Sequence, residues 1–176
     1  MNPLRAIAAR AAEKGLGFLV AGGHAVILHG YPRNTFDVDL IIRRDDQGQW
    51  AQLAQGLGYS LHREGPTFLQ FNPSGSQALP LDLMLVNDGT FTKLSVEAVS
   101  GPTSAGGARV VSLRHLLALK CHAIKHGHAG RVVKDADDVV NLVKANRLDL
   151  NDPEIREIFQ KHGTPELYEK IQRVCR

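Results

Sequence analysis

The sequence has few cysteines and no long apolar run. Its two cysteines, Cys121 and Cys175, are too few for a disulfide framework or a four-cysteine zinc site, which favours a reducing compartment. No stretch reaches the roughly 18 uninterrupted apolar residues of a membrane-spanning helix, so no membrane span is expected. Residues 1–15 carry charged residues through an apolar pattern, which is typical of an amphipathic helix rather than a signal peptide. We therefore expect a cytoplasmic protein.

Acidic residues are also missing from one stretch of the chain. The whole chain has 21 basic and 18 acidic residues, a net charge of only +3. Residues 112–134 contain no Asp or Glu, and they hold these basic residues and histidines: Arg114, His115, Lys120, His122, Lys125, His126, His128, Arg131 and Lys134. Such a segregated basic segment suits a phosphate-bearing ligand or RNA. The plainer interpretation is a solvated helix face, which charge alone favours.

Hydrophobic spacing divides the chain into a mixed half and a helical half. The pattern predicts helices at 3–14, 24–29, 47–57 and 91–99, and strands at 18–21, 36–42, 59–63, 67–71 and 79–86. From Ser112 onward it predicts helices alone, with further helix starts at Asn151 or Asp152 and at Thr164, each just before a proline. We expect an α/β (α+β) fold with a small mixed sheet and flanking helices over residues 1–111. A C-terminal helical region, residues 112–176, is expected to pack on that core.

Three acidic residues lie in the predicted strands. Asp37 and Asp39 are two apart, so their side chains share a face, and two ionised carboxylates that close repel each other unless a cation neutralises them. Carboxylate oxygens favour Mg²⁺ or Mn²⁺ over zinc. Asp82 stands alone in an apolar strand, where a charge is unfavourable unless it is paired or bound to metal. Three such acids on adjacent strands would form a two-metal site for phosphoryl or nucleotidyl transfer. The alternatives are an edge strand on which Asp37 and Asp39 face solvent, and an Asp82 at a strand end that is bonded to the backbone or to an arginine.

A glycine pair lies between the first predicted strand and the next helix. Gly22 and Gly23 permit close approach of the backbone to a phosphate, although most such pairs are only tight turns. Thirteen residues separate Gly23 from Asp37, which leaves room for one short helix and a return. The turn and the carboxylates can therefore meet at one edge of the sheet.

This combination resembles the nucleotidyltransferase superfamily, with the DNA polymerase β-like fold. The resemblance rests on Gly22, Gly23, Asp37, Asp39 and, by its position on a later strand, Asp82. It covers residues 18–86 and, more loosely, the helices after 112. The string GGHAVILHGYPRNTFDVDLII is similar to small bacterial members related to the AbiEii and MenT toxins. Many members carry serine where Gly23 stands.

The resemblance implies a metal-dependent transfer of a nucleoside monophosphate from an NTP to a hydroxyl group. Asp37 and Asp39 would hold two Mg²⁺ ions, with Mn²⁺ as an alternative, and Asp82 would bind the second ion and act as general base. Gly22 and Gly23 would hold the β and γ phosphates, with help from His24. Arg33 would contact the triphosphate, and the alternative is an arginine of a surface turn. The acceptor would be an RNA such as tRNA, a protein or a small molecule. The enzyme would be the toxin of a toxin–antitoxin pair, with an antitoxin protein as partner.

One lysine interrupts an apolar helix face in the second half. Lys120 falls in line with Leu113, Leu116, Leu117 and Ile124, so it needs a partner such as a nucleotide phosphate or Asp135. The AbiEii-like proteins have a similar helix-borne lysine followed by a basic residue and Asp, matched here by Lys120, Lys134 and Asp135. The resemblance thus places Lys120 and Lys134 in the nucleotide pocket.

Two other interpretations remain open. A non-catalytic module that binds a nucleotide or a partner protein is supported by Gly23 in place of serine, and opposed by the intact acidic residues. A small glycosyltransferase with an Asp-x-Asp metal site is disfavoured by the length of 176 residues. The histidines His122, His126 and His128 lack the further ligands of a zinc site and are interpreted as a polar face and loop.

Overall fold

Contacts between residues group the chain into two units. The sheet unit comprises Met1–Ala25 and Arg33–Ser112, and the helical unit comprises Val26–Pro32 and Leu113–Arg176. The computed structural model describes residues 3–75, 78–127 and 129–175, and of residues 129–131 only the backbone. No helix in these ranges combines the length and the apolar character needed to cross a bilayer. A domain boundary at residue 111 stays a prediction, although segment 26–32 groups with the later helices.

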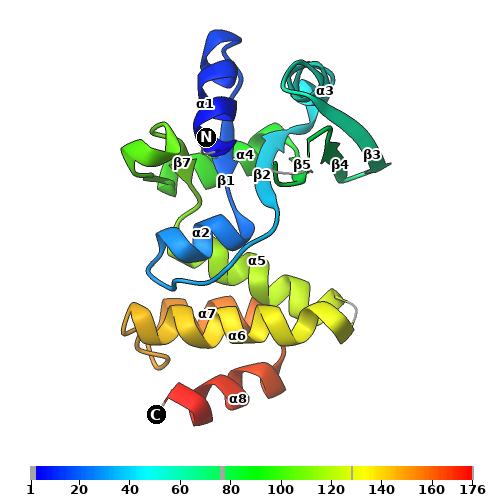
Figure 1. The fold of residues 1–176 in the computed structure, drawn as a ribbon. Coiled ribbons are helices and arrows are strands. Elements are labelled where there is room, and N and C mark those ends of the chain that lie inside the picture. The colour runs from blue at the N-terminus through cyan, green and yellow to red at the C-terminus, as the bar shows by residue number, and fades with distance from the viewer. Residues whose placement is uncertain (1–2, 76–77, 128, 176) are drawn as a thin grey trace. The chain divides into compact units, whose positions relative to one another are not determined.

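A mixed sheet of seven strands forms the framework of the sheet unit (Figure 1). Its strand order is β3-β4-β5-β2-β1-β7-β6. The strands span Phe18–Val20 (β1), Val38–Arg43 (β2), Tyr59–Gly65 (β3), Phe68–Pro73 (β4), Leu81–Val86 (β5), Val99–Ser100 (β6) and Arg109–Val110 (β7). Strands β2 and β5 pair in parallel at the centre, and β2 also pairs antiparallel with β1. The mixed α/β fold expected from the sequence is confirmed.

Alternating burial gives the central strand β5 two different faces. Leu81, Leu83 and Leu85 are buried, whereas the intervening Asp82 and Met84 are half-buried. Successive side chains of a strand point to opposite faces, so the leucines pack into the core and Asp82 lies on the other face. This alternation explains how one charged residue is accommodated in an otherwise apolar strand.

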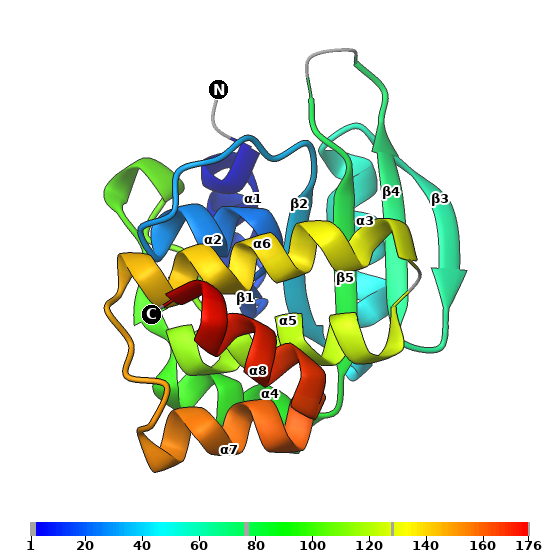
Figure 2. The same ribbon diagram turned by 90° about the horizontal axis from the view of Figure 1, so that it is seen from below.

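Helices and short turns complete the sheet unit. They are α1 (Pro3–Glu13), η1 (Arg44–Asp46), α3 (Gln47–Gly56), α4 (Asp88–Glu97) and η2 (Thr103–Ala105). Helices α1 and α3 lie on the same side of the sheet (Figures 1 and 2). The fully buried Trp50 of α3 meets Phe18 of β1 edge to face, with 5.6 Å between ring centroids. The apolar face expected for the helix at 47–57 is therefore buried in the core against the sheet.

Four helices build most of the helical unit (Figure 2). They are α5 (Leu113–His126), α6 (Ala129–Ala145), α7 (Pro153–His162) and α8 (Pro165–Cys175). Helix α5 packs against α6 and α7, and α8 packs against the same two helices. The two proline-marked starts are confirmed: Asp152 accepts hydrogen bonds from the N–H groups of Glu154 and Ile155, and Thr164 accepts one from Leu167.

Long-range hydrogen bonds explain why segment 26–32 groups with the helical unit. Asn146 of α6 donates to the carbonyl oxygen of His29 at 2.9 Å, and the Tyr31 hydroxyl donates to Asp137 at 2.9 Å. Helix α2 (Gly22–Leu28) accordingly begins in the sheet unit and ends in the helical unit.

Three local expectations need correction. The glycine pair is not a turn before a helix but the first two residues of α2. The strand expected at 36–42 begins only at Val38, so Asp37 lies in the bend before it. The helix expected at 91–99 ends at Glu97, and Val99 begins β6. Neither β6 nor β7 is predicted from the sequence, because two-residue strands are too short to show a period of two.

The packing of the helical unit predicts that its two thiols react very differently. Cys121 is fully buried, and burial raises its thiol pKa to about 12, so about one thiol in ten thousand is ionised at pH 8. Cys175 is half-buried. In the native protein, a disulfide reagent at pH 8 should modify Cys175 and leave Cys121 intact, as followed by mass spectrometry.

A Cys175→Ser variant isolates the second thiol for this measurement. It should take up reagent only after guanidinium unfolding. Rapid modification of native Cys175→Ser protein would contradict the packing described for α5.

Candidate active site

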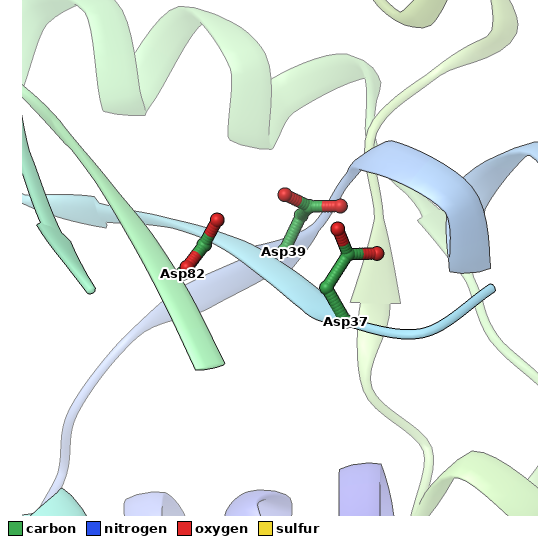
Figure 3. A group of neighbouring side chains, drawn as sticks. All are labelled: Asp37, Asp39 and Asp82. Atoms are coloured by element: carbon green, nitrogen blue, oxygen red, sulfur yellow. The ribbon is translucent and has the colours of Figure 1, made fainter. Parts of the chain in front are cut away.

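Three carboxylates converge on one face of the sheet (Figure 3). Asp37 precedes β2, Asp39 lies on β2, and Asp82 lies on β5 directly opposite Asp39 in the parallel register. All three are half-buried, and one oxygen from each lies within 4.8 Å of the others. The structure therefore brings together the three acids that the sequence pattern singled out.

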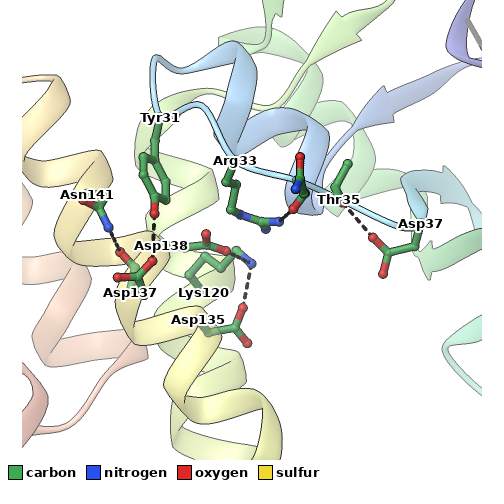
Figure 4. Close-up of polar contacts among 10 residues, drawn as sticks. Tyr31, Arg33, Thr35, Asp37, Lys120, Asp135, Asp137, Asp138 and Asn141 are labelled. Carbon is green, nitrogen blue, oxygen red and sulfur yellow. Dashed lines mark hydrogen bonds and ion pairs between the residues drawn. The ribbon is translucent and has the colours of Figure 1, made fainter.

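Side-chain donors bind the carboxylates of Asp37 and Asp82. The Thr35 hydroxyl donates to Asp37 Oδ1 at 2.9 Å (Figure 4), and Gln70 Nε2 donates to Asp82 Oδ2 at 3.0 Å. Gln70 lies on β4 opposite Asp82 in the antiparallel register. Neither donor is among the site residues predicted from the sequence. The available signals were a hydroxyl two residues before Asp37 and a polar residue within the apolar run of β4.

The chemistry of this donor set fits a divalent cation. Two unit charges 4.8 Å apart repel by about 3 kcal/mol at an effective dielectric constant of about 20. The two hydrogen bonds reduce that repulsion without neutralising it. Carboxylate oxygens are the ligands that Mg²⁺ and Mn²⁺ prefer, so the three acids are suited to hold such an ion.

The glycine pair makes room for the side chains of this site. A Cβ on Gly22 would overlap the Asp39 carboxylate and lie 2.6 Å from Asp39 Cβ, and Gly22 also has a left-handed φ of +53°. A Cβ on Gly23 would overlap the Thr35 hydroxyl. Both positions thus require glycine because Asp39 and Thr35 pack directly on the backbone of α2. Phosphate binding by the pair stays a prediction.

Two further residues expected to bind nucleotide belong to the sheet unit. Burial lowers the pKa of His24, and Arg33 lowers it further while Asp37 raises it, so the imidazole is neutral at pH 7. Its Nε2 is buried, with no hydrogen-bond partner in the described part of the chain. Arg33 is half-buried and donates to the Asn34 carbonyl at 2.8 Å. Their roles in binding a nucleotide stay predictions.

Lys120 forms a buried charge cluster within the helical unit (Figure 4). Its Nζ lies 2.6 Å from Asp135 Oδ1 and 2.7 Å from Asp138 Oδ2. The Lys120 and Asp135 side chains are 11% exposed, and that of Asp138 is 1% exposed. Asp135 is one of the two alternative partners predicted for Lys120 from the sequence. The contact with Asp138 was not predicted. Lys134 is exposed on α6.

Two histidines of α5 contact each other on its exposed side. The exposed His122 and His126 are one helical turn apart, with 4.5 Å between ring centroids. His128 lies outside the described residues.

Comparison with solved structures finds this fold among nucleotidyltransferases. ANT(2″)-Ia in complex with adenylyl-2″-tobramycin matches with a TM-score of 0.53 at 16% identity, over 96% of this chain and 90% of that one. The lincosamide antibiotic adenylyltransferase LnuA, with lincomycin bound, matches with a TM-score of 0.55 at 16% identity, over 75% and 89%. A nucleotidyltransferase-like antigenic protein from Paracoccidioides brasiliensis matches with a TM-score of 0.55 at 17% identity, over 96% and 90%.

These likenesses confirm the expected resemblance at the level of the fold. No protein-family model matches the chain. No curated protein matches it in sequence either.

The crowding at α2 predicts that Gly22→Ala damages the site. The new Cβ would displace Asp39 and strain a residue with positive φ, which should lower the free energy of unfolding by about 1–3 kcal/mol. Denaturant unfolding measures this loss. Gly48→Ala is the matched control, because Gly48 lies in α3 with open space around it. The idea is wrong if both alanine variants are equally stable.

The buried charges predict that Lys120→Met destabilises the helical unit. Methionine would leave Asp135 and Asp138 without their shared cation, which should reduce the free energy of unfolding by about 3–5 kcal/mol. Lys144→Met, at an exposed position on α6, should change stability by less than about 0.5 kcal/mol. The triple variant Lys120→Met/Asp135→Asn/Asp138→Asn should regain part of the loss. A Lys120→Met chain as stable as the Lys144→Met control would refute the structural role of the cluster.

Proposed function

We propose that this chain is a metal-dependent nucleotidyltransferase that moves a nucleoside monophosphate from an NTP to an acceptor hydroxyl. The observation that carries the proposal is that Asp39 on β2, Asp82 on β5 and Asp37 just before β2 each place one oxygen within 4.8 Å of the others. The chain has a fold similar to those of known nucleotidyltransferases, which supports the proposed activity.

In this proposal each acid has a defined task. Asp37 and Asp39 would hold two Mg²⁺ ions, and Asp82 would hold the second ion and accept the proton of the acceptor hydroxyl as general base. The bound ions would neutralise the triphosphate and lower the pKa of the acceptor hydroxyl. The acceptor oxygen forms a bond to the α-phosphorus while the bond from that phosphorus to pyrophosphate breaks. Gln70 orients Asp82 for its task through the hydrogen bond to Oδ2.

The remaining candidate residues would bind the nucleotide. A neutral His24 adds no charge next to the acids. The half-buried Arg33 contributes a positive charge in the same unit. Gly22, Gly23, Lys120 and Lys134 complete the nucleotide-binding set that the family resemblance implies.

The chemical class of the acceptor is the more specific part of the proposal. A small-molecule acceptor is supported by ANT(2″)-Ia and LnuA, whose structures hold adenylyl-2″-tobramycin and lincomycin. An RNA acceptor such as tRNA is supported by basic groups exposed on α5 and α6, namely His122, Lys125, His126 and Lys134. The sequence interpretation alone supports the remaining parts of the proposal. These are a protein acceptor, the toxin role, an antitoxin partner and a cytoplasmic location.

One structural finding bears on the alternative of a non-catalytic binding module. That alternative is supported by glycine at position 23 in place of serine. The Thr35 hydroxyl occupies the space of the missing side chain, but it donates its hydrogen to Asp37 and so does not replace a serine as a donor to a phosphate.

Label transfer tests the proposal directly. The protein with Mg²⁺ and each α-labelled NTP should label an acceptor in total RNA, cell lysate or a panel of aminoglycosides and lincosamides, with release of pyrophosphate. Asp37→Asn and Asp39→Asn should reduce transfer by about 100-fold or more, because each removes a charged ligand.

The matched control is Asp45→Asn, which changes an exposed acid just beyond the end of β2. It should transfer label at the wild-type rate. Full activity in Asp39→Asn would overturn the mechanism. Nucleotide binding without transfer to any of the acceptors would identify the chain as a binding module.

A further inference from the structure

We propose that Thr35 is a positioning residue: its side chain occupies the place of a side chain at residue 23, and its hydroxyl sets the orientation of Asp37. The orienting role rests on the proposed function of the acids as metal ligands. The exclusion of any side chain at position 23 is a matter of packing and is independent of that function.

The direction of the Thr35 side chain follows from its surroundings in the segment before β2. Phe36 is 74% exposed, whereas its neighbours Thr35 and Asp37 are half-buried. Thr35 and Asp37 thus both turn away from solvent, whereas Phe36 between them faces it. Their hydrogen bond of 2.9 Å, from Oγ1 to Oδ1, joins them there (Figure 4).

The second observation concerns the space above Gly23. This residue is buried and has no left-handed φ, so its backbone would accept any residue. A Cβ at this position would overlap Thr35 Oγ1 and lie 2.8 Å from Thr35 Cβ, and Arg33 Nη1 would be 3.1 Å away. Arg33 can withdraw its long side chain, whereas Thr35 has a short branched one. Thr35 is therefore what forces residue 23 to be glycine.

These two observations describe one interdependent pair. The Thr35 side chain is wedged against Gly23 on one side and hydrogen-bonded to Asp37 on the other, and a β-branched side chain has few rotamers to choose from. A carboxylate that accepts a fixed hydrogen bond on one oxygen presents the other in a defined direction. Partners of this kind typically change metal affinity 10–100-fold when they are removed.

Four variants test the pair. Thr35→Val keeps the shape and removes the donor, and Thr35→Ser keeps the donor in a smaller side chain. Gly23→Ser introduces the overlap, and Gly23→Ser/Thr35→Gly removes it again by deleting the Thr35 side chain. The readouts are Mn²⁺ affinity, measured by electron paramagnetic resonance without nucleotide, and the melting temperature.

The expected results separate orientation from packing. Thr35→Val should bind Mn²⁺ about 10–100-fold more weakly than wild type at a similar melting temperature, and Thr35→Ser should stay within about threefold. Gly23→Ser should melt well below wild type. The double variant should melt above Gly23→Ser, whereas independent sites would add their losses.

Two outcomes would overturn the inference while the proposed function stands: wild-type Mn²⁺ affinity in Thr35→Val, or a double variant that melts no higher than Gly23→Ser. A wild-type chain that binds no Mn²⁺ would instead overturn the proposed function together with the orienting role of Thr35. In that case the melting temperatures alone decide whether Thr35 excludes a side chain at Gly23.

Discussion

The mutual repulsion of three carboxylates is the constraint around which the sheet unit is organised. Asp39 and Asp82 face each other across the parallel pair β2–β5, and Asp37 joins them from the bend before β2. No fold gains stability from such crowding unless other groups offset it. The neighbouring donors Thr35 and Gln70 offset part of it, and the remaining negative charge is what makes the site attractive to a cation.

Close packing at the start of α2 follows from the same constraint. Gly22 is glycine for two reasons, its left-handed backbone and the Asp39 carboxylate above it, whereas Gly23 is glycine only because Thr35 lies against it. The two adjacent glycines are thus required by two different neighbouring side chains. The glycine pair is therefore part of the framework of the acidic site, whatever ligand binds there.

The sequence predicted the parts of this site that depend on local pattern. Asp37 and Asp39 are two apart, and Asp82 interrupts an apolar strand, so both features are visible without a structure. Lys120 was visible in the same way, as a charge on an apolar helix face. Asp138 and Gln70 were not, because their partners are set by helix packing and by strand register rather than by spacing. The glycine pair was assigned to a ligand because a sequence does not show which side chains approach a backbone.

Segment 26–32 has a consequence for how the chain can be divided. Because this segment groups with the helices, the chain passes between the two units three times, at residues 25–26, 32–33 and 112–113. Removing everything after residue 112 would strip His29 and Tyr31 of the hydrogen bonds that they share with Asn146 and Asp137. A fragment ending there would keep segment 26–32 without the helices with which it groups. The helical unit therefore cannot be separated from the sheet unit by dividing the chain at one position.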